Sequence, residues 1–131
     1  MKILVCVSRD MGIAFNNRRQ SRDAVLCEDV ITMSSGNTLR IHPKSEILFP
    51  EATNLAVSET YLSEAEQNDY CFYEGYGDIC WENVDSVILY HWNRAYPSDT
   101  FFKMPKGFTL TEQIKFSGKS HPEITREVWQ K

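Results

Sequence analysis

The chain has 131 residues, the length of one ordinary domain, and its 42% apolar and 24% charged residues are typical of a soluble globular protein. No apolar stretch approaches the about 20 residues that span a bilayer, and the opening MKILVCVSRD lacks the long apolar run of a signal peptide. A net charge of −4 argues against a general nucleic-acid binder. We therefore expect a single cytoplasmic domain over residues 1–131, with no membrane partner, and leave the oligomeric state open.

Four cysteines lie in apolar-patterned segments and lack the C-x-x-C spacing of zinc or redox sites. We expect them to be buried thiols in a reducing compartment, with no disulfide framework and no metal. They are Cys6, Cys27, Cys71 and Cys80.

Charge is distributed unevenly along the chain. All fourteen Lys and Arg residues lie outside the stretch 45–93. That stretch holds the acidic residues Glu46, Glu51, Glu59, Glu64, Glu66, Asp69, Glu74, Asp78, Glu82 and Asp85. An acidic middle with basic ends would steer an anionic ligand toward the ends. The alternatives are a solubilising face and a docking face for a basic partner protein.

The first third of the chain predicts a strand, a polar loop and a helix. Residues 2–8 form a continuous apolar run, typical of a strand buried on both faces. After the loop, Ser21 is the predicted N-cap of a helix with an apolar stripe at Leu26, Val30 and Met33, ended by the glycine of SSGN.

Further strands are predicted at 38–42, 54–57, 70–74, 86–92 and, as an antiparallel strand, 108–116. Pro43 opens a short helical segment. Two more helices are predicted from capping-box spacing, one over 58–69 (Ser63 and Glu66) and one over 120–131 (Ser120 and Glu123). This alternation indicates an α/β domain with a mixed sheet.

The order of these elements, with the strings GIAFNN (12–17) and SDTFF (98–102), resembles a shortened dihydrofolate reductase. GIAFNN is similar to that family's mobile loop after the first strand, and FTLTEQIKF (108–116) to its penultimate strand. The resemblance implies a three-layer domain: a mixed sheet with flanking helices and an antiparallel C-terminal edge.

Departures from the reductase pattern fall on its chemistry. Gln20 and Ser21 replace Pro-Trp, and Leu26 stands where a carboxylate serves the pterin. Where the family has paired glycines beside which the dinucleotide pyrophosphate binds, this chain has EGYG (74–77), and Glu74 would repel phosphate. Lys44 and Ser45 remain as a possible anion site at a helix start. We therefore expect no NADPH-dependent reduction and no cofactor.

Three separated blocks resemble more closely a family of small bacterial proteins, mainly from Firmicutes. The blocks are GIAFNNRRQSRD (12–23), LYHWNRAYPSD (89–99) and GKSHPEITRE (118–127). Members often carry the label ribonuclease Z, whose zinc chemistry needs an H-x-H-x-D-H cluster. The three isolated histidines here (His42, His91 and His121) do not support that label.

On the reductase-like topology the three blocks lie near the carboxyl ends of the strands, where open α/β sheets bind ligands. Arginine forks, amides and aromatic rings suit an anionic, planar, nucleotide-like molecule. The candidate ligand-binding residues are Asn16, Arg18, Arg19, Gln20, Ser21, Trp92, Asn93, Arg94, Tyr96 and Ser120, with His121 as the candidate catalytic residue.

Each of these residues also has an ordinary structural interpretation. In this interpretation the arginines pair with acids, Ser21 and Ser120 only cap helices, and Trp92 and Tyr96 only pack. His121, in a predicted first helical turn, is expected to be solvated.

Three functions remain open: a ligand-binding module without reductase activity, a metal-independent phosphodiesterase or ribonuclease, and a protein-interaction module with an acidic face. The nuclease would use His121, an arginine cluster and a second proton-transfer group among Glu74, Glu123 and Glu127.

Overall fold

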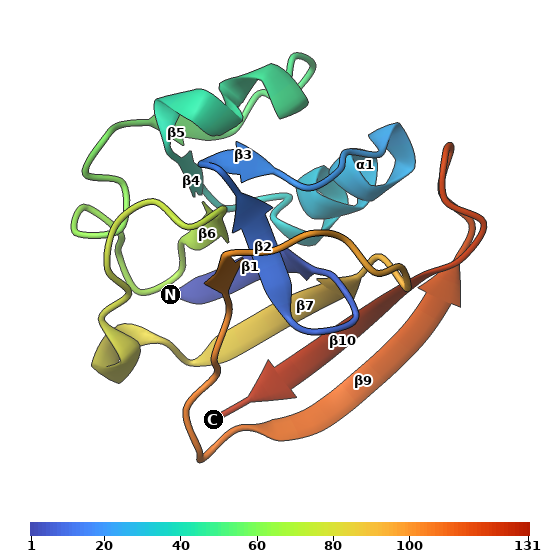
Figure 1. The fold of residues 1–131 in the computed structure, drawn as a ribbon. Coiled ribbons are helices and arrows are strands. Elements are labelled where there is room, and N and C mark those ends of the chain that lie inside the picture. The colour runs from blue at the N-terminus through green and yellow to red at the C-terminus, as the bar shows by residue number, and fades with distance from the viewer.

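The centre of the protein is a seven-stranded mixed sheet, described for all residues 1–131 by a computed structural model (Figure 1). Its strand order is β5-β4-β6-β1-β7-β10-β9. The strands are β1 Lys2–Val7, β4 Leu39–Ile41, β5 Leu55–Val57, β6 Tyr70–Tyr73, β7 Ser86–His91, β9 Thr109–Phe116 and β10 Ile124–Gln130. The first five of these in the order pair in parallel, whereas β10 runs antiparallel to both β7 and β9. The chain is thus a single small α/β domain, as the sequence predicts.

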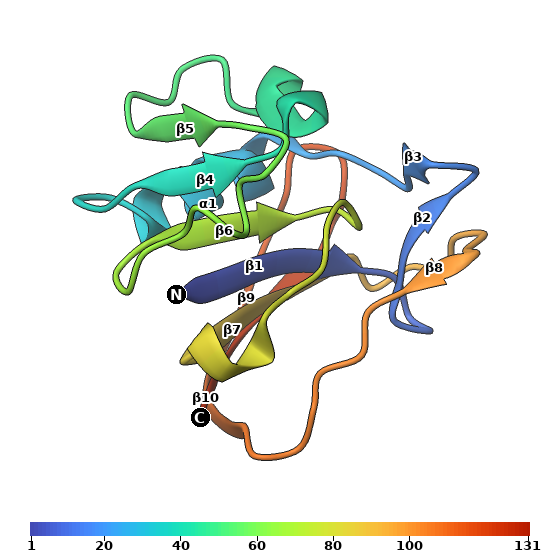
Figure 2. The same ribbon diagram turned by 90° about the vertical axis from the view of Figure 1, so that its left-hand side faces the viewer.

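Both faces of the sheet are covered by a hydrophobic core, and alternate residues of β1 point into the two cores. Leu4 packs in one core with Leu26 of helix α1 (Ala24–Met33), while Ile3 and Val5 pack in the other. The 3-10 helix η1 (Pro43–Leu48) covers the same face as α1, which lies behind β4 and β6 in Figure 2. Irregular segments and the short 3-10 helix η2 (Trp81–Asn83) cover the opposite face.

A small second sheet of order β3-β2-β8 stands at the carboxyl end of β1 (Figure 2). It consists of β2 (Gly12–Phe15), β3 (Arg18–Arg19) and β8 (Thr100–Phe101). Asn16 and Asn17 have left-handed φ values of 51° and 59°, the geometry of a two-residue hairpin turn that asparagine tolerates. The segment that was predicted from the sequence to be a polar loop therefore begins as a β-hairpin.

The helix predicted over 58–69 is absent. The segment makes isolated turns, and the hydroxyls of Ser58 and Thr60 both donate to the carboxylate of Glu64. Tyr61 and Leu62, which are adjacent in sequence, are both buried in the core. A turn can bury two adjacent side chains, whereas the apolar stripe of a helix buries side chains three or four residues apart. Hydroxyl-bearing side chains that bond locally disfavour a continuing helix.

The prediction of a closing helix over 120–131 is also wrong, because residues 124–130 form the strand β10 between β7 and β9. The segment is rich in β-branched residues (Ile124, Thr125 and Val128), which favour strands. Two flanking strands supply hydrogen-bond partners on both sides, so pairing overrides the capping-box spacing. Ser120 and Glu123 do not cap a helix.

Candidate functional site

The candidate site lies at the edge of the sheet where the parallel strands β1, β4, β6 and β7 end. Residues 19–23 follow the small hairpin into α1, and residues 117–123 connect β9 to the start of β10 at this same edge. Crevices at the carboxyl ends of strands are the usual ligand sites of open α/β sheets. The three sequence blocks therefore do meet at one end of the molecule.

His121 is the point at which the three blocks converge. Its ring is 3% exposed and lies against the indole of Trp92, with ring centroids 4.5 Å apart. Its Nδ1 is 3.0 Å from Oδ2 of Asp23. Its Nε2 is 3.0 Å from the Ser21 hydroxyl and 3.1 Å from the Tyr96 hydroxyl. The expectation of a solvated histidine in a helical turn is wrong.

Asp23 holds this histidine and also begins α1. Its Oδ1 accepts hydrogen bonds from the backbone N–H groups of Val25, Leu26 and Lys119, and its Oδ2 accepts from the backbone and hydroxyl of Ser120. Asp23, rather than the predicted Ser21, is therefore the N-cap. Burial alone would raise the pKa of Asp23, but the hydrogen bonds from His121 and these amides outweigh it and hold the pKa well below its usual value.

Gly118 allows the loop before β10 to approach this carboxylate. A Cβ at Gly118 would lie 2.5 Å from Oδ2 of Asp23 and 2.8 Å from Cδ1 of Ile124. The backbone N–H of Gly118 donates to the carbonyl of His121 at 2.8 Å, which closes the turn. The glycine is thus required by close packing.

The surroundings of His121 fix which ring nitrogen carries the hydrogen. An ionised carboxylate only accepts hydrogen bonds, so Nδ1 is protonated and donates to Asp23. In the neutral ring, Nε2 then presents a lone pair to the hydroxyls of Ser21 and Tyr96. A base held in this way can take a proton from one of the two hydroxyls.

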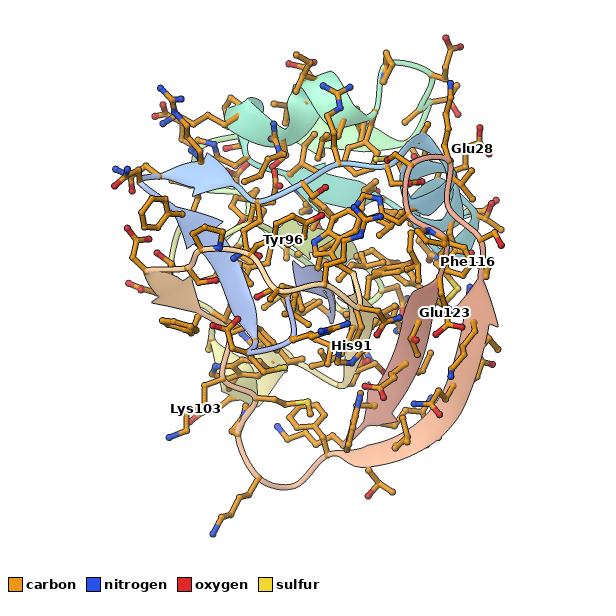
Figure 3. All side chains as sticks on the ribbon, turned by 45° about the vertical axis from the view of Figure 1, so that its right-hand side comes forward. Glu28, His91, Tyr96, Lys103, Phe116 and Glu123 are labelled. Carbon is orange, nitrogen blue, oxygen red and sulfur yellow. The ribbon has the colours of Figure 1, made fainter.

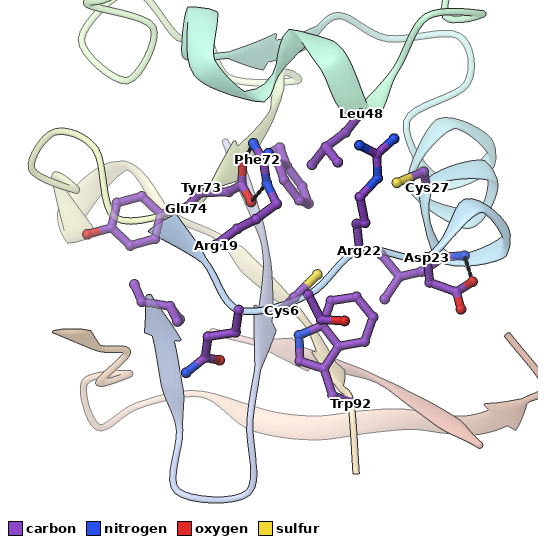
Figure 4. A pocket seen from close by; sticks show the side chains of 14 residues that line it. Cys6, Arg19, Arg22, Asp23, Cys27, Leu48, Phe72, Tyr73, Glu74 and Trp92 are labelled. Atoms are coloured by element: carbon purple, nitrogen blue, oxygen red, sulfur yellow. Dashed lines mark hydrogen bonds and ion pairs between the residues drawn. The ribbon is translucent and has the colours of Figure 1, made fainter. Parts of the chain in front are cut away.

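A small inner cavity of about 20 Å³ opens beside Ser21 (Figure 4). Its wall is largely apolar and includes Leu26, Phe72 and Trp92. A wider groove of about 500 Å³ adjoins it, and Arg22, Asp23, Cys27 and Leu48 line both hollows. The cavity and the groove are together called the depression at the start of α1.

Arg22 stands where the two hollows meet. In Figure 4 its side chain rises from the loop between Leu48 and Cys27, away from Glu74. The residue is exposed, and its guanidinium has no hydrogen-bond or ion-pair partner in the protein. Neither Arg22 nor Asp23 was among the residues predicted for the site, although both lie in the polar loop. The available signal for Asp23 was that Asp is preferred at an N-cap as strongly as Ser.

Arg19 differs from Arg22 because it is already neutralised. Its Nε and Nη2 donate to the two carboxylate oxygens of Glu74 at 2.9 and 2.8 Å, and Nη2 also donates to the carbonyl of Lys44. The Ser45 hydroxyl donates to the same carboxylate at 2.7 Å. Glu74 therefore places the protein's own negative charge at the Ser45 hydroxyl, within the possible anion site at Lys44 and Ser45.

Of the remaining predicted site residues, only Gln20 lines the inner cavity. Asn16 and Arg18 are exposed on the hairpin, and Arg94 is exposed with one long contact to the carbonyl of Ser120. Asn93 has a left-handed φ of 59°, and its side-chain amide donates to Glu123 and Thr125, which ties the loop after β7 to β10. Gln20 lines the cavity, and its buried side-chain oxygen has no partner.

None of the carboxylates considered as second proton-transfer groups forms a hydrogen bond or ion pair with His121. Glu74 pairs with Arg19 and Glu127 with His91, and Glu123 is exposed beside the start of β10 and pairs with Lys115 (Figure 3). No group of three His, Cys, Asp or Glu side chains converges as a metal site.

The four cysteines are free thiols. Cys27 and Cys71 are buried as predicted, whereas Cys6 is half-buried and Cys80 is exposed. No helix combines the length and apolar character needed to cross a membrane.

No protein-family model and no curated protein matches the chain. The assignment of a function therefore depends on the geometry of this depression and on the chemistry of the residues that line it.

Proposed function

We propose that the protein binds a small anionic ligand with a planar, apolar part, such as a nucleotide-like molecule, in the depression at the start of α1. The observation that carries this proposal is the unpartnered guanidinium of Arg22 between two hollows. A guanidinium binds phosphate or carboxylate oxygens through two parallel hydrogen bonds, so an anion there would satisfy it.

The lining of the two hollows supports a ligand with distinct parts. The inner cavity has room for only a small group of the ligand, which would donate a hydrogen bond to the unpartnered side-chain oxygen of Gln20. The planar part would lie in the groove, whose wall includes Ile31, Leu48 and Pro50. The charged residues of the groove besides Arg22 are Lys119, Glu28 and Glu51, with Asp23 at its inner end. A ligand with one anionic group near Arg22 fits this charge pattern better than a polyanion, because these acids would repel further charge.

We further propose that the cleft derives from a dihydrofolate-reductase-like domain without NADPH-dependent reduction. The order of elements supports the first part, since β9 is followed by one last strand and is thus the penultimate strand of the chain. The second part is supported by Glu74, whose carboxylate would repel a phosphate in the turn where the resemblance implies a cofactor pyrophosphate. The free thiols favour a reducing compartment, so a cytoplasmic location belongs to the same proposal.

Thermal unfolding with millimolar adenosine 5′-monophosphate, inorganic phosphate and benzoate tests the binding proposal. A ligand that binds only the folded protein raises its midpoint. We expect adenosine 5′-monophosphate to stabilise the wild type and an Arg18→Gln control, which removes a nearby arginine outside the cavity, but not Arg22→Gln. Absence of stabilisation by all three compounds, or equal stabilisation of Arg22→Gln, would contradict the proposal.

A further inference from the structure

We propose that Ser21, His121 and Asp23 act as nucleophile, general base and positioning residue, and that the protein hydrolyses small carboxylic esters or thioesters. The preference for an anionic substrate rests on the proposed binding function, because Arg22 supplies it. The hydrolytic step itself does not depend on that function.

The distances between the three side chains match the requirements of this chemistry. A nucleophile and its base must be within about 2.6–3.2 Å, and a third group must orient the base. Ser21 Oγ is 3.0 Å from His121 Nε2, and His121 Nδ1 is 3.0 Å from Asp23 Oδ2. The same arrangement of serine, histidine and carboxylate recurs on unrelated folds, so its recognition depends on geometry and not on sequence order.

Burial supports separate roles for the three residues. Asp23 and His121 are each 3% exposed, so water does not compete for their hydrogen bond. Ser21 is half-buried and lines the inner cavity, which His121 does not. Ser21 is therefore partly exposed at the border of the cavity, where a substrate can approach it, while the base is buried.

The reaction proceeds in two steps. Ser21 Oγ attacks the carbonyl carbon as its proton passes to His121 Nε2, and the tetrahedral intermediate then expels the alcohol or thiol, which takes that proton. A water molecule next attacks the acyl-serine and gives a proton to Nε2, and the carbon–Oγ bond breaks to release the carboxylic acid as Ser21 regains its proton. One water is consumed and no redox partner is needed.

Two donors are available for the negative charge that develops on the carbonyl oxygen. The backbone N–H of Arg22, the residue after the nucleophile, donates no hydrogen bond within the protein. The Tyr96 hydroxyl, 3.1 Å from His121 Nε2, is the second: once Nε2 has taken the Ser21 proton it no longer accepts a hydrogen bond, and the Tyr96 hydroxyl can donate to the oxyanion instead. Preorganised donors of this kind contribute a large part of the rate in acyl transfer.

If the network of Ser21, His121 and Asp23 served only stability, Ser21 would not react with a reagent for activated serines. We would treat the native protein with a fluorophosphonate, locate the adduct by mass spectrometry, and measure hydrolysis of p-nitrophenyl acetate and of an ester carrying a carboxylate. The expected adduct is on Ser21. Ser21→Ala should lose it and lower hydrolysis at least about 100-fold, whereas the matched control Ser117→Ala, an exposed serine near the end of β9, should keep both.

Asp23→Asn provides the test of the positioning role. It should slow labelling of Ser21 and shift the pH profile of that reaction, because the imidazole loses the carboxylate that fixes its tautomer. A merely structural Asp23 would leave the profile of the folded protein unchanged, and circular dichroism identifies the folded fraction.

The outcomes separate this inference from the proposed binding function. If Ser21 stays unlabelled and both esters are stable while adenosine 5′-monophosphate still binds through Arg22, the hydrolytic inference is wrong and the binding proposal stands. If Ser21 is labelled but Arg22→Gln hydrolyses both esters at wild-type rates, the hydrolytic inference stands and the anionic preference is wrong.

Discussion

Asp23 and His121 lie 98 residues apart in the chain, yet their side chains are joined at 3.0 Å and both are almost fully buried. Asp23 begins α1, and His121 precedes β10, so this contact fastens the loop after the hairpin to the C-terminal strands. Further donors surround the same carboxylate, from the α1 backbone and from the loop before β10. The contact thus joins helix capping, loop closure and the orientation of a candidate base.

Replacing Asp23 with Asn should destabilise the fold although the two side chains have the same shape. Each carboxylate oxygen faces three donors, so an Asn NH₂ group would oppose donors in either orientation. We expect the free energy of unfolding to fall by about 2–4 kcal/mol, because the helix cap is weakened and buried donors lose their acceptor. Urea denaturation measures it, with Asp78→Asn, an exposed change on the β6–β7 loop, as the control.

The pH dependence of that difference provides a second measurement. Because the pKa of Asp23 is lowered in the folded state, its contribution is fully present above the unfolded pKa of about 3.9 and is lost as pH falls toward the folded pKa. The gap in unfolding free energy between wild type and Asp23→Asn should be constant above about pH 5 and narrow below about pH 4. A gap that stays constant into strong acid would show that Asp23 does not titrate as described.

Gly118→Ala should disturb the same contact from the other side. The added methyl group would meet the Asp23 carboxylate at 2.5 Å, so the loop before β10 or the carboxylate must move. We expect a loss of about 1–3 kcal/mol and a changed NMR signal of the His121 Nδ1 proton. Ser117→Ala at the adjacent exposed position should change stability by less than about 0.5 kcal/mol. Wild-type stability and an unchanged proton signal in Gly118→Ala would contradict the packing argument.

Most strands of the fold could be predicted from sequence because their signals are local. The apolar run of β1 and the alternation around β9 each determine a strand without reference to the rest of the chain. The last strand could not be recognised in this way. Ser120 and Glu123 have the spacing of a capping box, but β10 gains its hydrogen bonds from β7 and β9, and strand pairing across the chain is not visible in a short window.

The convergence of the three blocks could be predicted from the sequence, but its centre could not: the blocks meet on His121 and not on a ring of arginines around the cavity. The partners of the arginines depend on tertiary contacts: Arg19 meets Glu74, which lies 55 residues away in the chain, whereas Arg22 meets none. Asp23 was not predicted as the N-cap of α1, because Ser21, two residues earlier, satisfies the same N-cap preference.

Glu74→Gln should make the possible anion site at Lys44 and Ser45 available to an added anion. The change removes the negative charge that holds Arg19 and the Ser45 hydroxyl. We expect a loss of about 1–3 kcal/mol in stability, since a partly buried guanidinium loses its ion-pair partner. Binding of inorganic pyrophosphate, measured by isothermal titration calorimetry, should appear or strengthen. Glu59→Gln, an exposed change on another loop, serves as the control. Unchanged pyrophosphate binding in Glu74→Gln would show that Glu74 does not block an anion site.

Cysteine reactivity should report on the inner cavity. Burial raises the pKa of Cys27 to about 11 and of Cys71 to about 12, and raises that of Cys6 well above its usual value, so these thiols hold little thiolate at neutral pH. Cys80 is exposed. Brief treatment of the native protein with iodoacetamide should therefore modify one thiol, and Cys80→Ser should abolish that fast reaction.

The slow thiols then distinguish a filled cavity from an empty one. Cys6 and Cys27 line the inner cavity, whereas Cys71 lies in the core on the opposite face of the sheet. In Cys80→Ser protein, a ligand in the cavity should slow alkylation of Cys6 and Cys27 by more than that of Cys71, because it blocks their direct approach as well as stabilising the fold. Equal protection of all three thiols would mean that the ligand binds elsewhere and acts only through global stability.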